Sequence, residues 1–274
     1  MASTASKAQL PFSFCGSAIG LLLVFRTNNA YQRLDDARGL WAELTYVVHE
    51  IASLVAASEG QGEPKEGGSD GHVPKMPTRD VVNVHRYLVA LVWALRDELR
   101  EEDARDDILR LLIVDEQEEL WISSSASRPR ALMNQLRRKL HAAWHQERLA
   151  AHTIFLLDGQ VKELGRLIAG CQRIFSSPIP PTMSRHGLRC LLLWLLALPV
   201  VLTGSVPPLV NVAWTAAMAF IYLGIDELGV QVEQPFQIIP LWQICQAAQD
   251  AVVDTLASPE RPLLPPAAGY QGAS

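Results

Sequence analysis

Residues 25–33, which read FRTNNAYQR, follow directly on an apolar stretch that runs from Leu10 to Phe25. That stretch contains no ionised side chain, whereas three arginines, Arg26, Arg33 and Arg38, come soon after it. An abrupt change from apolar to basic residues is typical of a membrane helix at the side of the bilayer that retains positive charge. The sequence therefore predicts a membrane helix over Leu10 to Phe25. Since about 16 residues is short for a span, a buried helix of a soluble protein stays as the alternative.

Small residues recur along the same stretch. Ser13, Gly16, Ser17 and Gly20 are spaced three and four apart, which places them on one stripe of a helix. Small residues on one stripe allow neighbouring helices to approach closely inside a membrane. We therefore expect this helix to pack against copies of itself or to line a path.

The composition of the 274-residue chain indicates a mixture of membrane spans and a substantial soluble helical part. Half of the residues are hydrophobic (49%), 19% are charged, and the mean hydropathy is +0.11. The net charge of −5 argues against nucleic acid as a partner. The four cysteines are far apart in sequence, so neither a disulfide framework nor a zinc site is indicated.

The chain divides into six segments. Apolar residues at helical spacing dominate most of it and strand signals are weak, so we predict an all-α fold in which membrane helices are combined with a soluble helical bundle. The segments are an N-terminal remnant (1–9), the membrane helix with its polar extension (10–57), a flexible loop (58–79), a soluble helical region (80–183), a membrane helical hairpin (184–229) and a C-terminal segment with a tail (230–274).

Two further features concern helix boundaries. Within the soluble region we expect the helical stretch from Ala131 to Phe175 to be interrupted near Asp158 and Gly159. The apolar runs 190–202 and 209–225 are joined by a turn containing two prolines, which predicts a hairpin that crosses the membrane and returns. Three spans would place the two termini on opposite sides of the membrane.

Several blocks of sequence resemble the bestrophin family, especially the plant, algal and bacterial branch described as voltage-dependent chloride channels. The first blocks are PFS at 11–13, the stretch 25–33, and RGLW at 38–41. The match returns at PIP, 178–180, and at YLGIDELGVQVEQPF, 222–236. These blocks occur in the order of the family and lie in both halves of the chain, whereas the middle matches only in its helical character. Together they are specific, and each alone is weak.

The resemblance implies a homopentameric channel that conducts chloride or bicarbonate through a hydrophobic neck. Carried over to this chain, it points Leu10, Phe14 and Ala18 toward the pore and places Pro11 and Ser13 at the neck. Ala18 is smaller than the residue that the family often has there, which leaves the width of the inner neck open. Ordinary helix packing is the alternative role for these residues.

Charge near the pore is the second implication. Five helices that begin near Pro11 would point their N-terminal N–H groups toward the axis, which favours anions. Arg26 and Asn28 are expected at the pore mouth, with a membrane-edge anchor as the alternative role for Arg26.

The sequence also departs from the family pattern. Leu34, Asp35 and Asp36 replace the usual tryptophan and glutamate, and QIIPLW at 237–242 lacks the carboxylates that bind calcium in animal members. No cofactor is therefore expected.

A membrane helix that precedes the pore helix in the family is missing, so a truncated product is expected. The alternatives are a non-conducting membrane-attached scaffold or truncated subunit, and then a soluble helical binding module.

Other candidate sites are weaker. His141, His145 and His152 fall near one helical face, but no acidic third ligand lies at a suitable spacing, so we expect no metal. The pair Asp226 and Glu227 is either a titrating gate or, as we favour, an interfacial stop. No phosphate loop, nucleophile elbow or paired-carboxylate motif is present in the sequence, so an enzyme is not expected.

The expected partners are the lipid membrane and other copies of the same chain. Resemblance to the plant and algal branch indicates the thylakoid membrane of the chloroplast. The opening residues 1–7 are too short and lack arginine, so they do not form a convincing transit peptide.

Overall fold

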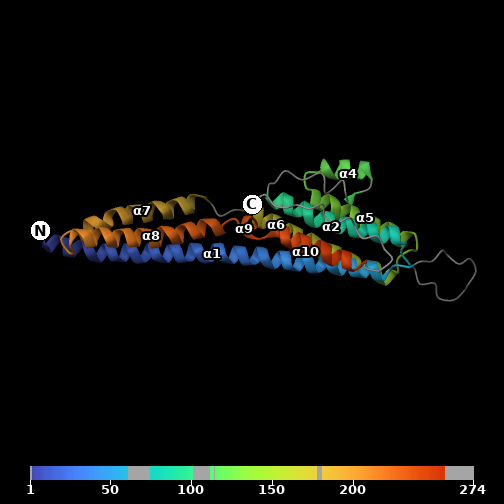
Figure 1. Ribbon diagram of the computed structural model, residues 1–274, viewed down its shortest axis with the longest axis horizontal. Helices are drawn as coiled ribbons and strands as arrows, with labels where there is room; N and C mark the ends of the chain where they lie inside the picture. The colour runs from blue at the N-terminus through green and yellow to red at the C-terminus, as the bar shows by residue number, and fades with distance from the viewer. Residues whose placement is uncertain (1, 61–74, 101–111, 114, 178–180, 257–274) are drawn as a thin grey trace, which may run out of the picture. The chain divides into compact units, whose positions relative to one another are not determined.

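The computed structural model describes residues 2–60, 75–100, 112–113, 115–177 and 181–256, and within these ranges the chain is helical and contains no strand (Figure 1). The isolated bridges Glu59–Met76 and Thr203–Val206 are the only β pairings in the same ranges. The predicted all-α fold is therefore confirmed. The chain divides into two compact units, one formed by residues 1–38 and 174–239 and the other by residues 39–173 and 240–274.

Helix α1 (Ala2–Ala57) is a continuous helix of 56 residues. It begins at Ala2 and not at Leu10 as predicted, because residues 2–9 are rich in alanine and other residues compatible with a helix. Pro11 therefore lies inside the helix. The N-terminal N–H groups that we expected near Pro11 are located at Ala2, so the predicted dipole contribution at Pro11 is wrong.

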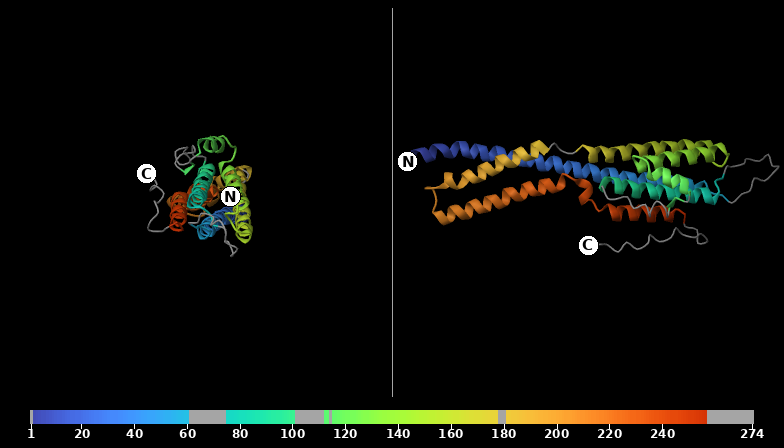
Figure 2. Two further views of the ribbon diagram at one scale, coloured as in Figure 1. Left: turned by 90° about the vertical axis from the view of Figure 1, so that its right-hand side faces the viewer. Right: turned by 90° about the horizontal axis from the view of Figure 1, so that it is seen from above.

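In the first unit, α7 (Pro181–Leu202) and α8 (Pro208–Val232) form an antiparallel hairpin, which extends three residues beyond the predicted segment 184–229 at each end (Figure 2). The connecting turn contains Gly204 with a φ of 86°, a conformation that glycine adopts without steric cost. The side-chain amide of Asn211 donates a hydrogen bond of 2.9 Å to the carbonyl oxygen of Pro199, which ties the start of α8 to the end of α7. The short helix α9 (Pro235–Ile238) follows α8.

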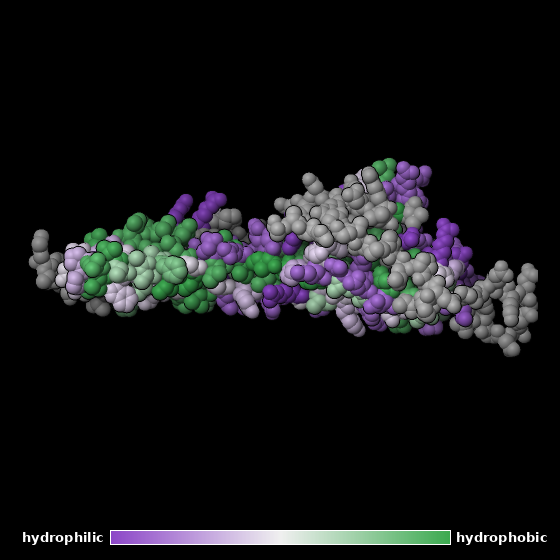
Figure 3. All heavy atoms as spheres, in the orientation of Figure 1, coloured by the Kyte–Doolittle hydropathy of each residue, from purple (hydrophilic) through white to green (hydrophobic). Residues whose placement is uncertain are grey.

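Apolar side chains point outward over much of this unit. The three helical segments long and apolar enough to cross a membrane are Phe12–Ala57, Arg185–Leu202 and Pro208–Val232, among the residues that the structure describes. Only 6% of the most apolar window of α8 is buried, and Phe220 on this helix is 83% exposed. Figure 3 shows hydrophobic surface over α7 and α8. A surface of this kind is stable when lipid covers it.

The second unit is a bundle around α2. It contains α2 (Thr78–Arg100), α4 (Glu116–Ser123), α5 (Arg128–His145), most of α6 (Ala151–Ser176) and α10 (Leu241–Asp254), together with the C-terminal part of α1. Helix α2 packs against α5 and α10 and is buried along most of its length. Trp41, Leu44, Leu88, Leu91, Leu95, Leu132, Leu136 and Leu140 are among its largest fully buried side chains.

The break between the long helices of this unit lies elsewhere than predicted. Asp158 and Gly159 are inside α6, and the chain leaves the helix after His145 instead. Glu147 adopts a φ of 58°, and the N–H of Arg148 then bonds back to the carbonyl oxygen of Ala143 at 2.9 Å. This closes the end of α5 in the way that a left-handed residue closes many helices. The prediction failed because glutamate is not a usual residue for that position, whereas Gly159 is a common helix breaker.

The ends of the predicted flexible loop are fixed by backbone hydrogen bonds. The N–H of Met76 donates to the carbonyl oxygen of Ser58 at 2.8 Å, and the N–H of Gly60 donates to Met76 at 3.2 Å. The intervening residues 61–74 and the predicted C-terminal tail from residue 257 lie outside the described residues.

Candidate functional site

One face of α1 packs closely within the first unit. A Cβ atom built on Gly16 would lie 2.8 Å from Cζ2 of Trp194, so only glycine allows this approach of α1 to α7. The Trp194 indole stacks on the Phe12 ring with centroids 5.1 Å apart, and its Nε1 donates to the carbonyl oxygen of Phe12 at 3.2 Å. Two turns further along α1, Leu23 is buried together with Leu191 and Leu195 of α7. The predicted stripe of small residues thus permits a close approach at Gly16, but the neighbour there is α7 of the same chain, and Ser13 and Ser17 are exposed. Packing against copies of the helix stays a prediction.

The opposite face of α1 is exposed in the described part of its unit, and only Phe25 on it also lines a pocket shared with α7. Side chains spaced three and four apart lie on one line of a helix. Such a line runs along α1 through positions that are all exposed: Phe14, Ala18, Leu21, Phe25 and Asn28. Phe14 is 73% exposed, although it lies two residues after the packed Phe12 and two residues before the buried Gly16. We call these five residues the open face of α1.

The predicted site residues separate into those on the open face and those elsewhere. Phe14, Ala18 and Asn28 belong to the open face, and Ser13 is exposed beside it. The carbonyl oxygen of Ser13 accepts a hydrogen bond of 3.1 Å from the Ser17 hydroxyl. The backbone of Leu10 and Pro11 is part of α1, but their side chains lie outside the described residues.

Arg26 does not lie on the open face. Its Nη1 is 2.5 Å from Oδ1 of Asp226, and its Nη2 is 2.9 Å from Oε1 of Glu233. Asp226 and Glu233 are seven residues apart and therefore project from the same side of α8 toward α1. One arginine thus faces two carboxylates, so its positive charge is compensated where it is. The role of Arg26 at a pore mouth stays a prediction.

Asp226 and Glu227, considered together in the sequence, lie in different surroundings in the structure. Asp226 is buried and bound to Arg26, whereas Glu227 is exposed and accepts a long hydrogen bond of 3.4 Å from the Gln231 amide. Ionised side chains inside membrane helices are costly unless paired, so the ion pair is the arrangement that a membrane helix requires.

A pocket of about 440 Å³ lies beside Arg26 in the same unit. Its walls are mainly apolar side chains of α1, and α7 contributes His186 and Cys190, whose Nε2 and Sγ atoms are 3.6 Å apart. The imidazole and the thiol are two ligand atoms, fewer than a structural metal site needs.

The histidines considered as metal ligands are distributed over two helices. His141 and His145 lie on α5, and His152 lies at the start of α6. Nε2 of His141 is 3.9 Å from the Asp158 carboxylate. Among the described residues, no group of three or more potential ligands of the histidine, cysteine, aspartate and glutamate types is close enough to hold a metal ion.

Comparison with known proteins identifies the family. The family described as Bacterial/Fungal Bestrophin protein matches residues 2–254, almost the whole described chain. The chain belongs to the bestrophin family. The resemblance stated from the sequence blocks is thus confirmed, and bestrophin membership together with the three apolar helices identifies an integral membrane protein.

Relatives of this bestrophin occur in plants and bacteria. It is 29% identical over 238 residues to the voltage-dependent chloride channel 2, chloroplastic, of Arabidopsis thaliana, with 86% of this chain and 53% of that protein covered. It is 28% identical over 260 residues to a voltage-dependent anion channel-forming protein of Ralstonia nicotianae, with 93% and 80% covered. The chain thus spans about half the length of the Arabidopsis relative and four fifths of the bacterial one.

Solved structures share the same fold. A crystal structure of a bacterial bestrophin homolog from Klebsiella pneumoniae superposes with a TM-score of 0.78 at 23% identity, covering 90% of this chain and 86% of the other. The helical order of this bestrophin is therefore that of a known membrane protein fold.

The sequence did not reveal the partners of Arg26. Asp226 is 200 positions away, and no local pattern connects the two. One signal was available, because a carboxylate within an otherwise apolar helix needs a buried cation, and Arg26 directly follows the other apolar run.

Proposed function

We propose that this bestrophin is an anion channel that conducts chloride, bicarbonate or both as a homopentamer, and that the open face of α1 lines its pore. The observation that carries this proposal is the difference between the two sides of α1. One side of the helix is fixed against α7 and α8, and the other side presents aligned and mostly apolar residues that are exposed in the described part of the unit.

The arrangement fits a hydrophobic neck at the level of Phe14. In a ring of copies, Phe14 and Ala18 would project toward the axis from consecutive turns, with Ser13 beside them. Leu10 precedes Phe14 by one turn, so it continues the same line, and Pro11 follows Leu10. Apolar rings of this kind control conduction by dewetting, so anions that lose water easily pass most readily.

Selectivity for anions would come from partial charges. The edge of an aromatic ring carries partial positive charge, which favours contact of Phe14 with a passing anion. Asn28 lies four turns further along the open face, where its side-chain amide offers N–H donors. Arg26 contributes little free positive charge in this arrangement, because Asp226 and Glu233 compensate it.

The names of the relatives support the transport of anions. The Arabidopsis relative is named a chloride channel and the Ralstonia relative an anion channel-forming protein. These names describe channels and not enzymes, so we propose that the chain has no catalytic role. Chloride is named for the plant relative, and bicarbonate is included because it carries the same single negative charge.

We further propose the thylakoid membrane as the location, since two Arabidopsis relatives are named chloroplastic. A fluorescent fusion of the full-length protein, imaged in the cells that express it, tests this point. Fluorescence in another membrane would contradict the compartment and leave the channel proposal unaffected.

Single-channel recording in planar bilayers tests the channel itself. We expect a current whose reversal potential follows the anion gradient. Phe14→Ala should raise the conductance because it widens the neck. Phe220→Ala serves as the matched control, since it removes an equally exposed phenyl ring from α8, and it should leave the conductance unchanged.

Size measurement of the protein in detergent tests the assembly. A stable pentamer is expected. A monomer that carries no current would contradict the proposal and support the alternative, a non-conducting membrane-attached scaffold or truncated channel subunit.

A further inference from the structure

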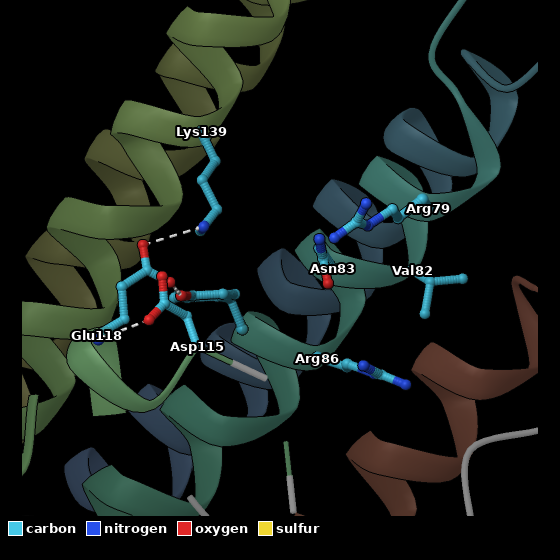
Figure 4. Close-up of a pocket in the computed structure, with 8 residues that line it drawn as sticks. Arg79, Val82, Asn83, Arg86, Asp115, Glu118 and Lys139 are labelled. Carbon is cyan, nitrogen blue, oxygen red and sulfur yellow. Dashed lines mark hydrogen bonds and ion pairs between the residues drawn. The ribbon is translucent and has the colours of Figure 1, made fainter. Parts of the chain in front are cut away.

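A pocket of about 540 Å³ lies in the second unit, between α2, α4 and α5 (Figure 4). This volume is typical of pockets that bind small organic ligands. Most of its lining side chains are charged or polar. They are Arg79, Val82, Asn83, Arg86 and Tyr87 from α2, Asp115 and Glu118 at the start of α4, and Lys139 from α5.

The two carboxylates of the pocket already have partners. Glu118 forms an ion pair with Lys139, whose Nζ is 3.0 Å from Oε1, and it also accepts a hydrogen bond from the Tyr87 hydroxyl. Asp115 caps α4 by accepting from the N–H groups of Gln117 at 2.9 Å and Glu118 at 3.4 Å. Figure 4 shows this group on one side of the pocket.

The arginines of the pocket are not paired in this way. Within the part of the chain that the structure describes, Arg79 and Arg86 have no ion pair and no side-chain hydrogen bond, and Nε of Arg86 is buried without a partner. The nearest carboxylate in sequence, that of Asp80, is bound to Arg148 with 2.7 Å between Oδ2 and Nη1. The pocket thus contains three basic and two acidic side chains, and its uncompensated charge is positive.

The spacing of the donors also matters. Arg79, Asn83 and Arg86 are four and three residues apart on α2, so they project from one side of the helix. Figure 4 shows Arg79 and Asn83 close together, whereas the side chain of Arg86, one turn further along α2, extends away from them and from Asp115. Two guanidinium groups and an amide offer several N–H donors, a set that suits an anion with several oxygens better than a single halide.

We propose that this pocket binds a water-soluble small molecule that carries a phosphate group. The phosphate would accept hydrogen bonds from Arg79 and Asn83, and from Arg86 once its flexible side chain turns toward them. The remainder of the molecule would occupy the space toward Tyr87 and Lys139. The pocket is formed within the second unit and contains no residue of the open face of α1, so the proposal is independent of ion conduction.

Isothermal titration of the full chain in detergent with inorganic pyrophosphate tests the site. We expect saturable binding in the millimolar range or below. Because charged hydrogen bonds contribute strongly to anion binding, Arg79→Gln and Arg86→Gln should each weaken it about tenfold or more. Arg138→Gln is the matched control, since Arg138 is an exposed arginine on α5 outside the pocket, and it should bind as the wild type does.

Conservative variants keep the test valid if a glutamine variant does not fold. Arg79→Lys and Arg86→Lys retain the charge and lose the planar fork, so they should show an intermediate loss. Absence of saturable binding to the wild type would overturn the proposal, and so would equal affinities in all variants. Binding to phosphatidate vesicles without binding of pyrophosphate would identify a lipid headgroup as the phosphate source and overturn a water-soluble ligand.

Discussion

The guanidinium of Arg26 on α1 lies 2.5 Å from the carboxylate of Asp226 on α8, and both side chains are mostly buried, with 15% and 9% of their surfaces exposed. Glu233, two turns further along α8, completes the group at 2.9 Å. The ion pair connects α8 with the end of the apolar stretch of α1, and it fixes which sides of α1 and α8 face each other.

Removal of the arginine should destabilise the protein strongly. Arg26→Gln removes the cation from the buried Asp226, and loss of one partner of a buried pair costs about 3–5 kcal/mol. Asp226→Asn should cost less, since Arg26 keeps Glu233. Thermal unfolding in detergent measures both, with the exposed Arg189→Gln as a control that should leave the midpoint unchanged. A double variant whose loss equals the sum of the single losses would contradict the direct coupling.

Gly16 should not tolerate a side chain. The Cβ of Gly16→Ala would lie 2.8 Å from the Trp194 ring, so α1 and α7 must separate, and overpacking of this kind costs about 1–3 kcal/mol. Gly224→Ala is the control, because nothing lies within 4 Å of a Cβ at this helical position. It should keep or raise stability by up to about 1 kcal/mol, the difference in helix propensity. Equal unfolding midpoints for the two variants would show that the contact with Trp194 is not tight.

Stability of the second unit should depend on the protonation of His85. This residue is buried on α2, with Nδ1 2.7 Å from the carbonyl oxygen of Val81 and Nε2 2.8 Å from the Thr255 hydroxyl. Burial lowers the pKa of His85 below its usual 6.5, despite hydrogen bonds to backbone carbonyls that act in the opposite direction. The unfolded chain therefore takes up a proton before the folded chain does as the pH falls.

The stability contributed by neutral His85 should thus be fully present above about pH 6.5 and decrease as the pH falls toward the folded-state value. His85→Gln should be less stable at neutral pH and should show a weaker decrease between about pH 7 and pH 5. The exposed His152→Gln should retain the decrease of the wild type. An unchanged pH dependence in His85→Gln would assign the effect to other groups.

Two of the four cysteines should resist modification by a maleimide while the protein is folded. Cys171 and Cys245 are buried, and burial raises the pKa of both thiols to about 12. Since the thiolate is the reactive form, a maleimide should modify these two only after unfolding. Mass spectrometry of labelled peptides reads this out, and rapid modification of Cys171 in the folded state would contradict the packing of α6.

Local patterns in the sequence were sufficient for the class of fold. The apolar runs and the helical spacing predicted an all-α membrane protein, and the blocks around residues 25–33 and 222–236 were enough to place it among the bestrophins. These features depend on residues close together in sequence. The break after His145 was missed because Glu147 adopts its left-handed conformation without the glycine or asparagine that usually signals it.

The features that the sequence did not predict depend on contacts between segments that are distant in the chain. The approach of Gly16 to Trp194 joins positions 178 residues apart, and the pocket around Arg86 combines three helices. A single sequence gives the composition of each helix but not the rotation of one helix against another, and that rotation decides which side chains meet. For the same reason the orientation of Leu10, Phe14 and Ala18 toward a pore came from family resemblance and not from residue spacing alone, and it stays a prediction.

The Trp194 indole lies between the rings of Phe12 on α1 and Tyr222 on α8, with centroid distances of 5.1 Å and 5.5 Å. The indole of Trp194 on α7 therefore contacts aromatic rings of both α1 and α8. A displacement of α1 relative to the α7–α8 hairpin changes the surroundings of the indole, and with them its emission. In a variant whose other six tryptophans are replaced by phenylalanine, Trp194 is thus an intrinsic optical reporter of helix movement that needs no added label.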